Sequence, residues 1–180
     1  DCLPMLENMG LRVIEEFAYD VYTGSGDDQI HYNVHDFYLE EPAQIPLDLS
    51  VLKTPMEHSL QAIWLEKVDN DGFNKLVRSA SLTYREALIL RVYSKYLRQL
   101  GSSYSEFYMQ DTLTQYGDIT KLLTKLFEIK FAINDNKRKE RNKAAEKTIS
   151  KIKNLLSNVG SLDQDRILRS CLNVIECSVR

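Results

Sequence analysis

The period of the hydrophobic pattern changes once along this chain, and the change limits what the chain can fold into. Between residues 11 and 39 apolar side chains mostly alternate with polar ones, whereas from residue 54 onward they recur every three or four positions. Alternation is typical of a half-buried strand, and the longer spacing is typical of an amphipathic helix. The sequence therefore predicts an α+β fold that is mostly α, with a short α/β segment followed by a multi-helix region.

The α/β segment is expected to contain the end of a helix and two strands. Residues 3–9 carry apolar side chains on one helical face, and Gly10 is placed to end that helix in the left-handed conformation. The sequence Gly-Ser-Gly-Asp-Asp at 24–28 separates two alternating runs, as a turn does. The apolar phase shifts at Asp36, which indicates a bulge or the end of the buried stretch. Because an isolated hairpin is only marginally stable, we expect a sheet or a helix to cover these strands.

Four Ser/Thr-x-x-Glu/Gln patterns predict helix starts, since such side chains can satisfy the unpaired amides of a first helical turn. They begin at Thr54, Thr83, Ser103 and Ser161. Pro55 would then occupy the first helical position, where its missing amide hydrogen removes no helical bond. In the helix that follows, the apolar stripe is expected to be Leu60, Ile63 and Trp64, and Asp118 is expected to cap a further helix.

Charge is distributed unevenly along the chain. Residues 1–50 contain eleven acidic side chains and one basic, a net charge of −10, and residues 132–180 contain eleven basic and six acidic, a net charge of +5. This asymmetry suggests contact with an oppositely charged partner, or between the two ends of the chain. No stretch approaches ~18 consecutive apolar residues, which excludes a transmembrane helix. Three cysteines without metal or disulfide spacing favour a reduced, cytoplasmic location.

Candidate chemical motifs are few. His31 and His35 would share a strand face about 13 Å apart, too far for one metal ion. Asp69 and Asp71 flank a helix break, where a capping or turn role is favoured over a cation site. No nucleotide-binding loop, nucleophile elbow or Cys/His metal set is present. We therefore expect no catalytic, cofactor-binding or metal-ligating residue in this chain, which reads as a structural or regulatory module.

The strongest charge feature is a basic run at residues 137–153, which contains eight Lys and Arg residues. Clustered cations could contact the phosphates of a nucleic acid. No aromatic side chains interleave with the run for base stacking, so a solvated helix face or an exposed connector is the preferred interpretation. Six tyrosines are expected in half-buried seams between helices. They are Tyr84, Tyr93, Tyr96, Tyr104, Tyr108 and Tyr116.

Several stretches resemble the large bacterial NAD-specific glutamate dehydrogenases, in the order and spacing of that family. They are LPMLENMGLRVI at 3–14, HDF at 35–37, DGFNKLV at 71–77, LTYRE at 82–86, LRVYSKYLRQ at 90–99 and SLDQDRILR at 161–169. The resemblance covers nearly the whole chain except residues 132–158. It implies a piece of a much longer polypeptide, with a partial ACT-like α/β segment and connector at 1–46, a helical domain at 47–131, and a basic connector with C-terminal helices at 132–180.

The resemblance also implies a function. The parent enzyme would oxidatively deaminate L-glutamate to 2-oxoglutarate and ammonium with NAD, using catalytic and NAD-binding residues outside this chain. This piece would be a non-catalytic regulatory and scaffolding segment whose partners are other domains of the parent chain, within a homo-oligomer and without a membrane. Two alternatives stay open: a stand-alone helical adaptor that binds nucleic acid or a protein through residues 137–153, with nucleic acid the less expected partner, and a module that binds a free amino acid.

Structural or interface roles are expected for a set of residues drawn mainly from these stretches. Gly72 is expected to fix a loop that Phe73 anchors by packing, and Tyr84 stands where the family usually has Trp. The complete set is Trp64, Asp71, Gly72, Phe73, Asn74, Tyr84, Arg85, Arg91, Tyr96, Asp165 and Arg166.

Overall fold

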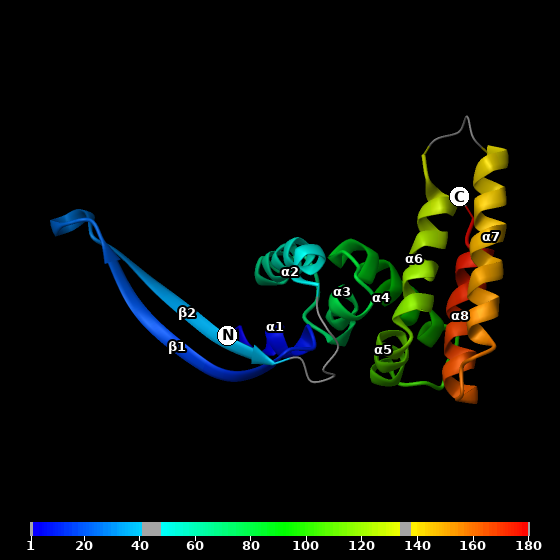
Figure 1. The fold of residues 1–180 in the computed structure, drawn as a ribbon, viewed down its shortest axis with the longest axis horizontal. Coiled ribbons are helices and arrows are strands. Elements are labelled where there is room, and N and C mark those ends of the chain that lie inside the picture. Colours follow the sequence, from blue (N-terminus) through cyan, green and yellow to red (C-terminus); the bar gives the residue numbers. More distant parts are fainter. Residues whose placement is uncertain (1, 41–47, 134–137, 180) are drawn as a thin grey trace.

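A computed structural model describes residues 2–40, 48–133 and 138–179, and it confirms the mostly helical α+β class (Figure 1). The expected connector at Pro42–Pro46 and the basic residue Lys137 lie outside the described residues. The elements are α1 (Leu3–Asn8), β1 (Arg12–Thr23), the short 3₁₀ helix η1 (Gly26–Asp28), β2 (Ile30–Glu40), α2 (Leu49–Trp64), a second 3₁₀ helix η2 (Gly72–Asn74), α3 (Lys75–Ser79), α4 (Tyr84–Gln99), α5 (Glu106–Gln115), α6 (Gly117–Phe131), α7 (Arg138–Leu156) and α8 (Leu162–Cys177).

The strands β1 and β2 form a two-stranded antiparallel hairpin that extends away from the helices (Figure 1). Gly10, with φ of +82°, ends α1 before it, as expected. The expected bulge at Asp36 is wrong, since Asp36 pairs regularly with Phe17. The bulge of this hairpin lies instead in β1 at Ile14, because Val13 pairs with Leu39 while Glu15 pairs with Tyr38. The expectation that another element covers the strands is wrong for the described residues, since both strands are exposed along most of their length.

The helical part encloses one apolar core. The helices α6, α7 and α8 lie side by side, and α4 and α5 pack against α8 and α6 (Figure 1). A second, smaller cluster of buried side chains joins α1 to α2 and α3. The main core includes Phe73, Leu76, Leu90, Leu113, Leu123, Leu126, Ile152, Leu168 and Ile175, and the smaller cluster contains Met5, Met9, Ile63 and Val77. The hairpin is therefore attached to the helices through α1.

The predicted helix starts at Thr83 and Ser161 are confirmed, and at both positions no neighbouring side chain among the described residues caps the helix instead. Thr83 and Glu86 form the predicted capping box, with the Glu86 amide donating to Thr83 Oγ1 at 3.3 Å and the Thr83 amide donating to Glu86 Oε2 at 2.7 Å. The helix α8 begins after Ser161 as expected, but the Ser161 side chain makes no capping hydrogen bond. Gln164, its expected box partner, bonds instead to α5 and to Tyr116.

Three predicted starts are wrong, two of them because another side chain caps the helix. Asp48 accepts the Ser50 amide at 3.0 Å and begins α2 before Thr54, so Pro55 lies inside that helix. Ser105, not Ser103, caps α5 by accepting the Tyr108 amide. The helix α6 begins at Gly117, and Asp118 lies within its first turn, where a carboxylate complements the helix dipole without capping.

The tyrosine seam is confirmed at most positions. Tyr93, Tyr104 and Tyr116 are partly buried against the main core, and their hydroxyls bond to Ser178, Asp163 and Gln164 at 2.9–3.0 Å. Tyr108 also packs against this core and Tyr84 is half-buried, whereas Tyr96 is 45% exposed and does not fit the prediction. No helix of the described ranges is both long and apolar enough to cross a membrane.

Candidate functional site

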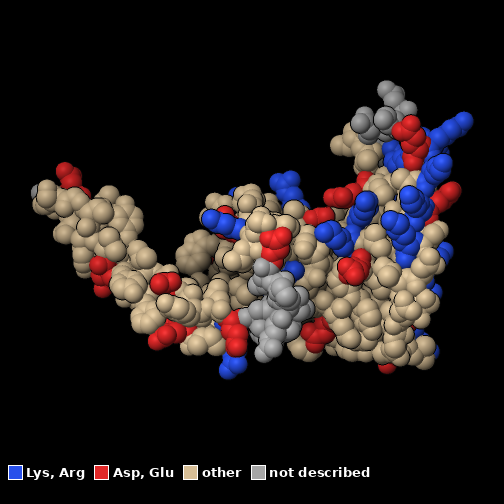
Figure 2. Space-filling view, in the orientation of Figure 1, with Lys and Arg blue, Asp and Glu red and all other residues tan. Residues whose placement is uncertain are grey.

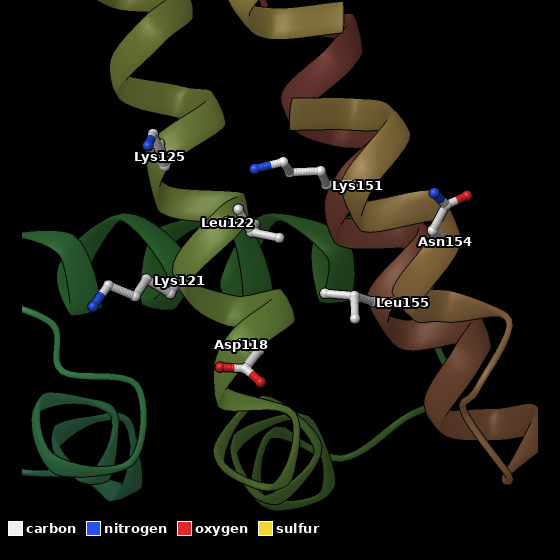
Figure 3. A pocket seen from close by; sticks show the side chains of 7 residues that line it. All are labelled: Asp118, Lys121, Leu122, Lys125, Lys151, Asn154 and Leu155. Carbon is white, nitrogen blue, oxygen red and sulfur yellow. The ribbon is translucent and has the colours of Figure 1, made fainter. Parts of the chain in front are cut away.

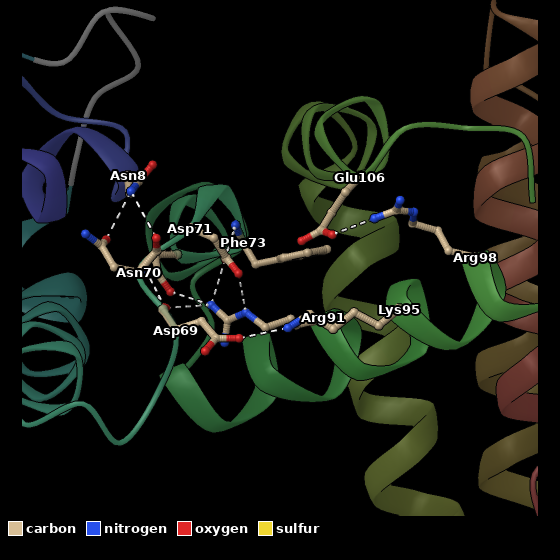
Figure 4. Close-up of polar contacts among 10 residues, drawn as sticks. Asn8, Asp69, Asn70, Asp71, Phe73, Arg91, Lys95, Arg98 and Glu106 are labelled. Atoms are coloured by element: carbon tan, nitrogen blue, oxygen red, sulfur yellow. Dashed lines mark hydrogen bonds and ion pairs between the residues drawn. The ribbon is translucent and has the colours of Figure 1, made fainter.

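Arg91, in α4, organises the loop that leads into η2 (Figure 4). Its side chain is only 2% exposed. The guanidinium donates to both carboxylate oxygens of Asp71, from Nε at 2.8 Å and from Nη2 at 2.9 Å. Nη2 also donates to Asn74 Oδ1 at 2.8 Å and to the Asp69 carbonyl at 3.2 Å. A buried cation requires such partners because the interior does not solvate it, and the planar guanidinium matches a carboxylate in two-bond geometry.

The shape of this loop follows from Asp71 and Gly72. Asp71 Oδ1 accepts the Phe73 amide at 2.9 Å and so caps η2. A Cβ atom at Gly72 would lie 2.3 Å from Gln110 Oε1, so any larger residue here would force the Gln110 side chain of α5 to move. Phe73 is fully buried, and the Arg91 guanidinium lies 5.7 Å from the centre of its ring. The expected turn role of Asp71 and anchoring role of Phe73 agree with these contacts.

Two further contacts connect the loop to helices on either side. Asn8, at the end of α1, donates from Nδ2 to Asn70 Oδ1 at 3.1 Å, and Lys95 of α4 donates to Asp69 Oδ2 at 2.8 Å (Figure 4). The hydrogen bond and charge of Lys95 hold the pKa of Asp69 below its usual 3.8. We refer to Asn8, residues 69–74, Arg91 and Lys95 as the junction cluster, because together they join α1, and with it the hairpin, to the helices.

The other residues singled out from the sequence lie apart from the junction cluster. Trp64 is 64% exposed, so its assignment to the apolar stripe of α2 is wrong, and it lines a shallow pocket beside α1. Tyr84 and Arg85 contact each other in the first turn of α4, with the Arg85 guanidinium 5.8 Å from the tyrosine ring centre. Tyr96 lines a groove of about 430 Å³ between α4 and α8.

Asp165 and Arg166 both form ion pairs within α8. The Asp165 carboxylate accepts from Arg169 Nε at 2.7 Å, and Arg166 Nη1 lies 3.6 Å from Asp163 Oδ1. These intrahelical pairs do not connect α8 to another element.

The hairpin has two unlike faces. We define the apolar hairpin face as six apolar side chains, 39–53% exposed, that cross-strand pairing places together on one side, with Thr23 and Asp36 at its two ends. They are Phe17, Tyr19, Val21, Ile30, Tyr32 and Val34. On the opposite face His31 bonds to Asp20 at 2.8 Å and His35 to Glu16 at 2.7 Å, which confirms that both histidines lie on one solvated strand face.

The basic run lies mainly on the exposed side of α7, and Figure 2 shows Lys and Arg gathered over this region. The acidic hairpin lies at the other end of the molecule, so the two oppositely charged ends do not meet within one copy (Figure 1). Within the described part of the chain, no group of three or more His, Cys, Asp or Glu side chains could hold a metal ion.

Two functional candidates have a weak sequence signal or none. Only the alternation of Tyr19, Val21, Tyr32 and Val34 indicates the apolar hairpin face. The Asp69–Lys95 pair has no local signal, because the two residues are 26 positions apart. A pattern of alternation predicts that one face is apolar, but not what covers that face.

Comparisons with known proteins connect these features to one kind of enzyme. Residues 1–52 match the family model for the glutamate dehydrogenase ACT3 domain, and residues 68–133 match that for glutamate dehydrogenase helical motif 3. The first match covers α1 and the hairpin, and the second covers the junction loop with α3 to α6. Along this chain the ACT3 match therefore precedes the helical-motif match.

Matches to individual enzymes identify the type of glutamate dehydrogenase more closely than the family models do. The chain is 37% identical over 180 residues to the NAD-specific glutamate dehydrogenase of Halomonas elongata and 32% identical over 181 residues to that of Pseudomonas aeruginosa. It is 31% identical over 183 residues to that of Mycobacterium tuberculosis. These alignments include 99–100% of this chain but only 11% of each relative. The resemblance to the large NAD-specific glutamate dehydrogenases is confirmed, and the chain aligns with a segment that makes up about a ninth of those enzymes.

Proposed function

We propose that this chain is a non-catalytic regulatory and scaffolding segment of an NAD-specific glutamate dehydrogenase. The parent polypeptide would convert L-glutamate to 2-oxoglutarate and ammonium and pass a hydride to NAD, with the catalytic and NAD-binding residues outside this chain. The observation that carries the proposal is the match of the whole chain to a segment amounting to 11% of the relatives. The three free cysteines favour a reduced, cytoplasmic setting for it.

The apolar hairpin face supports a scaffolding role because a face of this kind needs a partner. Two strands of 11–12 residues make a face of roughly 37 by 10 Å, about 370 Å². That area is well below the about 800 Å² that each partner contributes to a stable interface between free molecules. We therefore infer that the occupant is another part of the same polypeptide, since a tethered partner is present at high effective concentration.

The junction cluster supports the same role by fixing the hairpin to the helices. Arg91 is buried and bonds to Asp71, and Asn8 bonds across to Asn70, so α1 and the core of the helical part meet through defined polar contacts. The smaller apolar cluster that includes Met9 and Val77 adds to this attachment. A partner docked on the hairpin would therefore transmit its position to α4 and the main core. The domain division at 1–46, 47–131 and 132–180 is kept as part of the proposal, as is assembly into a homo-oligomer.

The proposal is tested with the parent protein obtained by extending the reading frame at both ends. The purified 180-residue chain should not reduce NAD when glutamate is added, whereas the parent should. In the parent, Tyr32→Lys places a charge on the apolar hairpin face, and we expect loss of glutamate-dependent NAD reduction or a change in oligomer mass. Asn33→Lys is the matched control, because its side chain points to the opposite, solvated face.

Two results would overturn the proposal. Glutamate-dependent NAD reduction by the isolated 180 residues would show that catalysis resides in this chain. Equal behaviour of the Tyr32→Lys and Asn33→Lys parents in both activity and oligomer mass would show that the apolar hairpin face has no partner within the enzyme.

A further inference from the structure

A groove of about 530 Å³ runs between α6 and α7 (Figure 3). Its volume lies in the range of roughly 300–1,000 Å³ that is typical of small-molecule sites. The side chains of two helices line it. They are Asp118, Lys121, Leu122 and Lys125 from α6, and Lys151, Asn154 and Leu155 from α7.

The groove has an excess of positive charge, because three lysines and one carboxylate, that of Asp118, line it. Among the described residues, Lys121, Lys125 and Lys151 have no ion-pair partner. Lys121 and Lys125 are one turn apart on the same helix, a spacing at which like charges destabilise a helix. Lys151 extends from α7 toward α6, whereas the Lys121 side chain points to the side of α6 away from α7 (Figure 3). Cations on both sides of the groove attract an anion, and a bound anion would relieve their mutual repulsion.

The remaining side chains of the groove provide an apolar surface and uncharged or acidic hydrogen-bonding groups. Leu122 and Leu155 are half-buried and lie between the ammonium groups of Lys125 and Lys151 at one end and Asp118 at the other (Figure 3). Leucine side chains on two facing helices form an apolar surface on which a flat ring can pack. The Asp118 carboxylate can accept hydrogen bonds from hydroxyl or amino groups, and Asn154 can both donate and accept.

We propose that this groove binds an organic phosphate of the nucleoside phosphate class. The phosphates bond to Lys125 and Lys151, the base packs on Leu122 and Leu155, and Asp118 accepts from hydroxyl or amino groups of the nucleoside. Such a ligand contacts both helices and so strengthens the attachment of α7 to α6. This inference is independent of the proposed function, since it concerns only residues of this chain.

The composition of the groove argues against two other anionic ligands, inorganic phosphate and nucleic acid. Inorganic phosphate would leave the leucine surface unused. A nucleic acid would follow the longer basic run of α7 and contact exposed lysines such as Lys139 and Lys153, which do not line the groove. The position of the cations beside an apolar surface therefore favours a ligand that has both phosphates and a ring.

The experiment uses the 180-residue chain, which itself supplies the core beneath α6 and α7, at an ionic strength of about 0.15 M. ADP, pyrophosphate, adenosine and a DNA duplex are titrated separately, with calorimetry for affinity and amide NMR shifts for location. We expect ADP to bind more tightly than pyrophosphate or adenosine and to shift amides near Lys125 and Lys151. The double variant Lys125→Gln/Lys151→Gln should lose at least about tenfold in ADP affinity, whereas Lys139→Gln/Lys153→Gln should bind as the unchanged chain does.

Each alternative outcome has one meaning. No saturable ADP binding, or equal loss in the two double variants, would overturn the proposal and leave α7 as a general basic surface. Tighter binding of DNA than of ADP, with dependence on Lys139 and Lys153, would replace the proposal by a nucleic-acid surface. Circular dichroism melting of all variants shows that they are folded, which is expected because every substituted lysine is exposed.

Discussion

Arg91 and Asp71 are joined by two parallel hydrogen bonds, Nε to Oδ2 at 2.8 Å and Nη2 to Oδ1 at 2.9 Å, although 20 residues separate them. The arginine side chain is 2% exposed and the aspartate side chain 22%. Breaking a buried pair by removing one partner leaves the other charge unsolvated, which costs about 3–5 kcal/mol. This pair therefore fixes the loop between α2 and α3 to α4 more firmly than any exposed ion pair could.

Arg91→Lys should lower the free energy of unfolding by about 2–4 kcal/mol, because an ammonium cannot make the two-bond contact and also reach Asn74 and the Asp69 carbonyl. Urea unfolding monitored by circular dichroism gives the change. Arg98→Lys is the matched control on the same helix: Arg98 pairs with Glu106 at 3.0 Å and is 50% exposed, so its replacement should cost less than about 1 kcal/mol. Equal losses of unfolding free energy in the two variants would mean that the buried Arg91–Asp71 pair stabilises the fold no more than the exposed Arg98–Glu106 pair does.

Gly117→Ala should destabilise the protein more than Gly72→Ala. A Cβ at Gly117 would lie 2.3 Å from the Ser79 carbonyl oxygen, which belongs to the backbone, whereas a Cβ at Gly72 would meet the end of the Gln110 side chain. A side chain can rotate away, but backbone displacement disturbs the packing of α3 on α6, and overpacking costs about 1–3 kcal/mol.

Gly160→Ala is the control for both glycine variants, since nothing lies within 4 Å of its Cβ position. Its midpoint of thermal unfolding should match that of the unchanged protein. If Gly117→Ala unfolds at the same temperature as Gly160→Ala, the close approach of α6 to Ser79 is not tight in solution.

The sequence predicted those parts of the fold that depend on local signals. The alternation on either side of residues 24–28 identified both strands, and Thr83 with Glu86 identified the start of α4. Competition between nearby caps caused the errors: Asp48 is as good a cap as Thr54, and it begins α2 earlier, so the ranking depends on tertiary packing. Pro55 is the seventh residue of α2, beyond the first turn, so it removes one helical hydrogen bond and does not mark where the helix begins.

The candidate site was harder to predict than the fold because its residues come from distant parts of the chain. Asp71 and Phe73 carried a local turn signal, but nothing in the sequence indicates that Arg91 bonds to Asp71 or that Lys95 bonds to Asp69. The sequence does not predict the groove between α6 and α7 for the same reason, because Lys125 and Lys151 line one groove only when the two helices pack together. Pairs of this kind require the three-dimensional structure.

The Asp69–Lys95 pair gives a prediction about pH. Lys95 holds the pKa of Asp69 below 3.8, mainly through its hydrogen bond and then through its charge. Because the folded-state value is lowered, the pair stabilises the fold above the ordinary pKa of aspartate, and this contribution is lost as pH falls through the lowered value. Both side chains are about half exposed or more, so the effect on stability should be small.

The variant Lys95→Met should therefore raise the pKa of Asp69 toward 3.8, measured by carbon NMR titration of its carboxyl group. Lys67→Met is a suitable control, because it removes an exposed lysine that makes no contact with Asp69 in the described structure. An unchanged Asp69 titration in Lys95→Met would show that the hydrogen bond does not persist in solution.

The last prediction concerns the two cysteines of α8. Cys171 is 1% exposed, and burial raises the pKa of its thiol from 9.0 to about 12, whereas Cys177 is exposed. The thiolate is the reactive form, so at pH 8 a maleimide should modify Cys177 at least about a hundredfold faster than Cys171. Because the folded-state pKa of the Cys171 thiol is raised, the buried neutral thiol contributes its full stability below pH 9 and progressively less as pH rises toward 12.

The measurement is the time course of labelling in a Cys2→Ser background, with Cys177→Ser to isolate Cys171 and urea to show that both thiols react when unfolded. Rapid labelling of Cys171 in the folded protein would mean that α8 detaches from the core under native conditions.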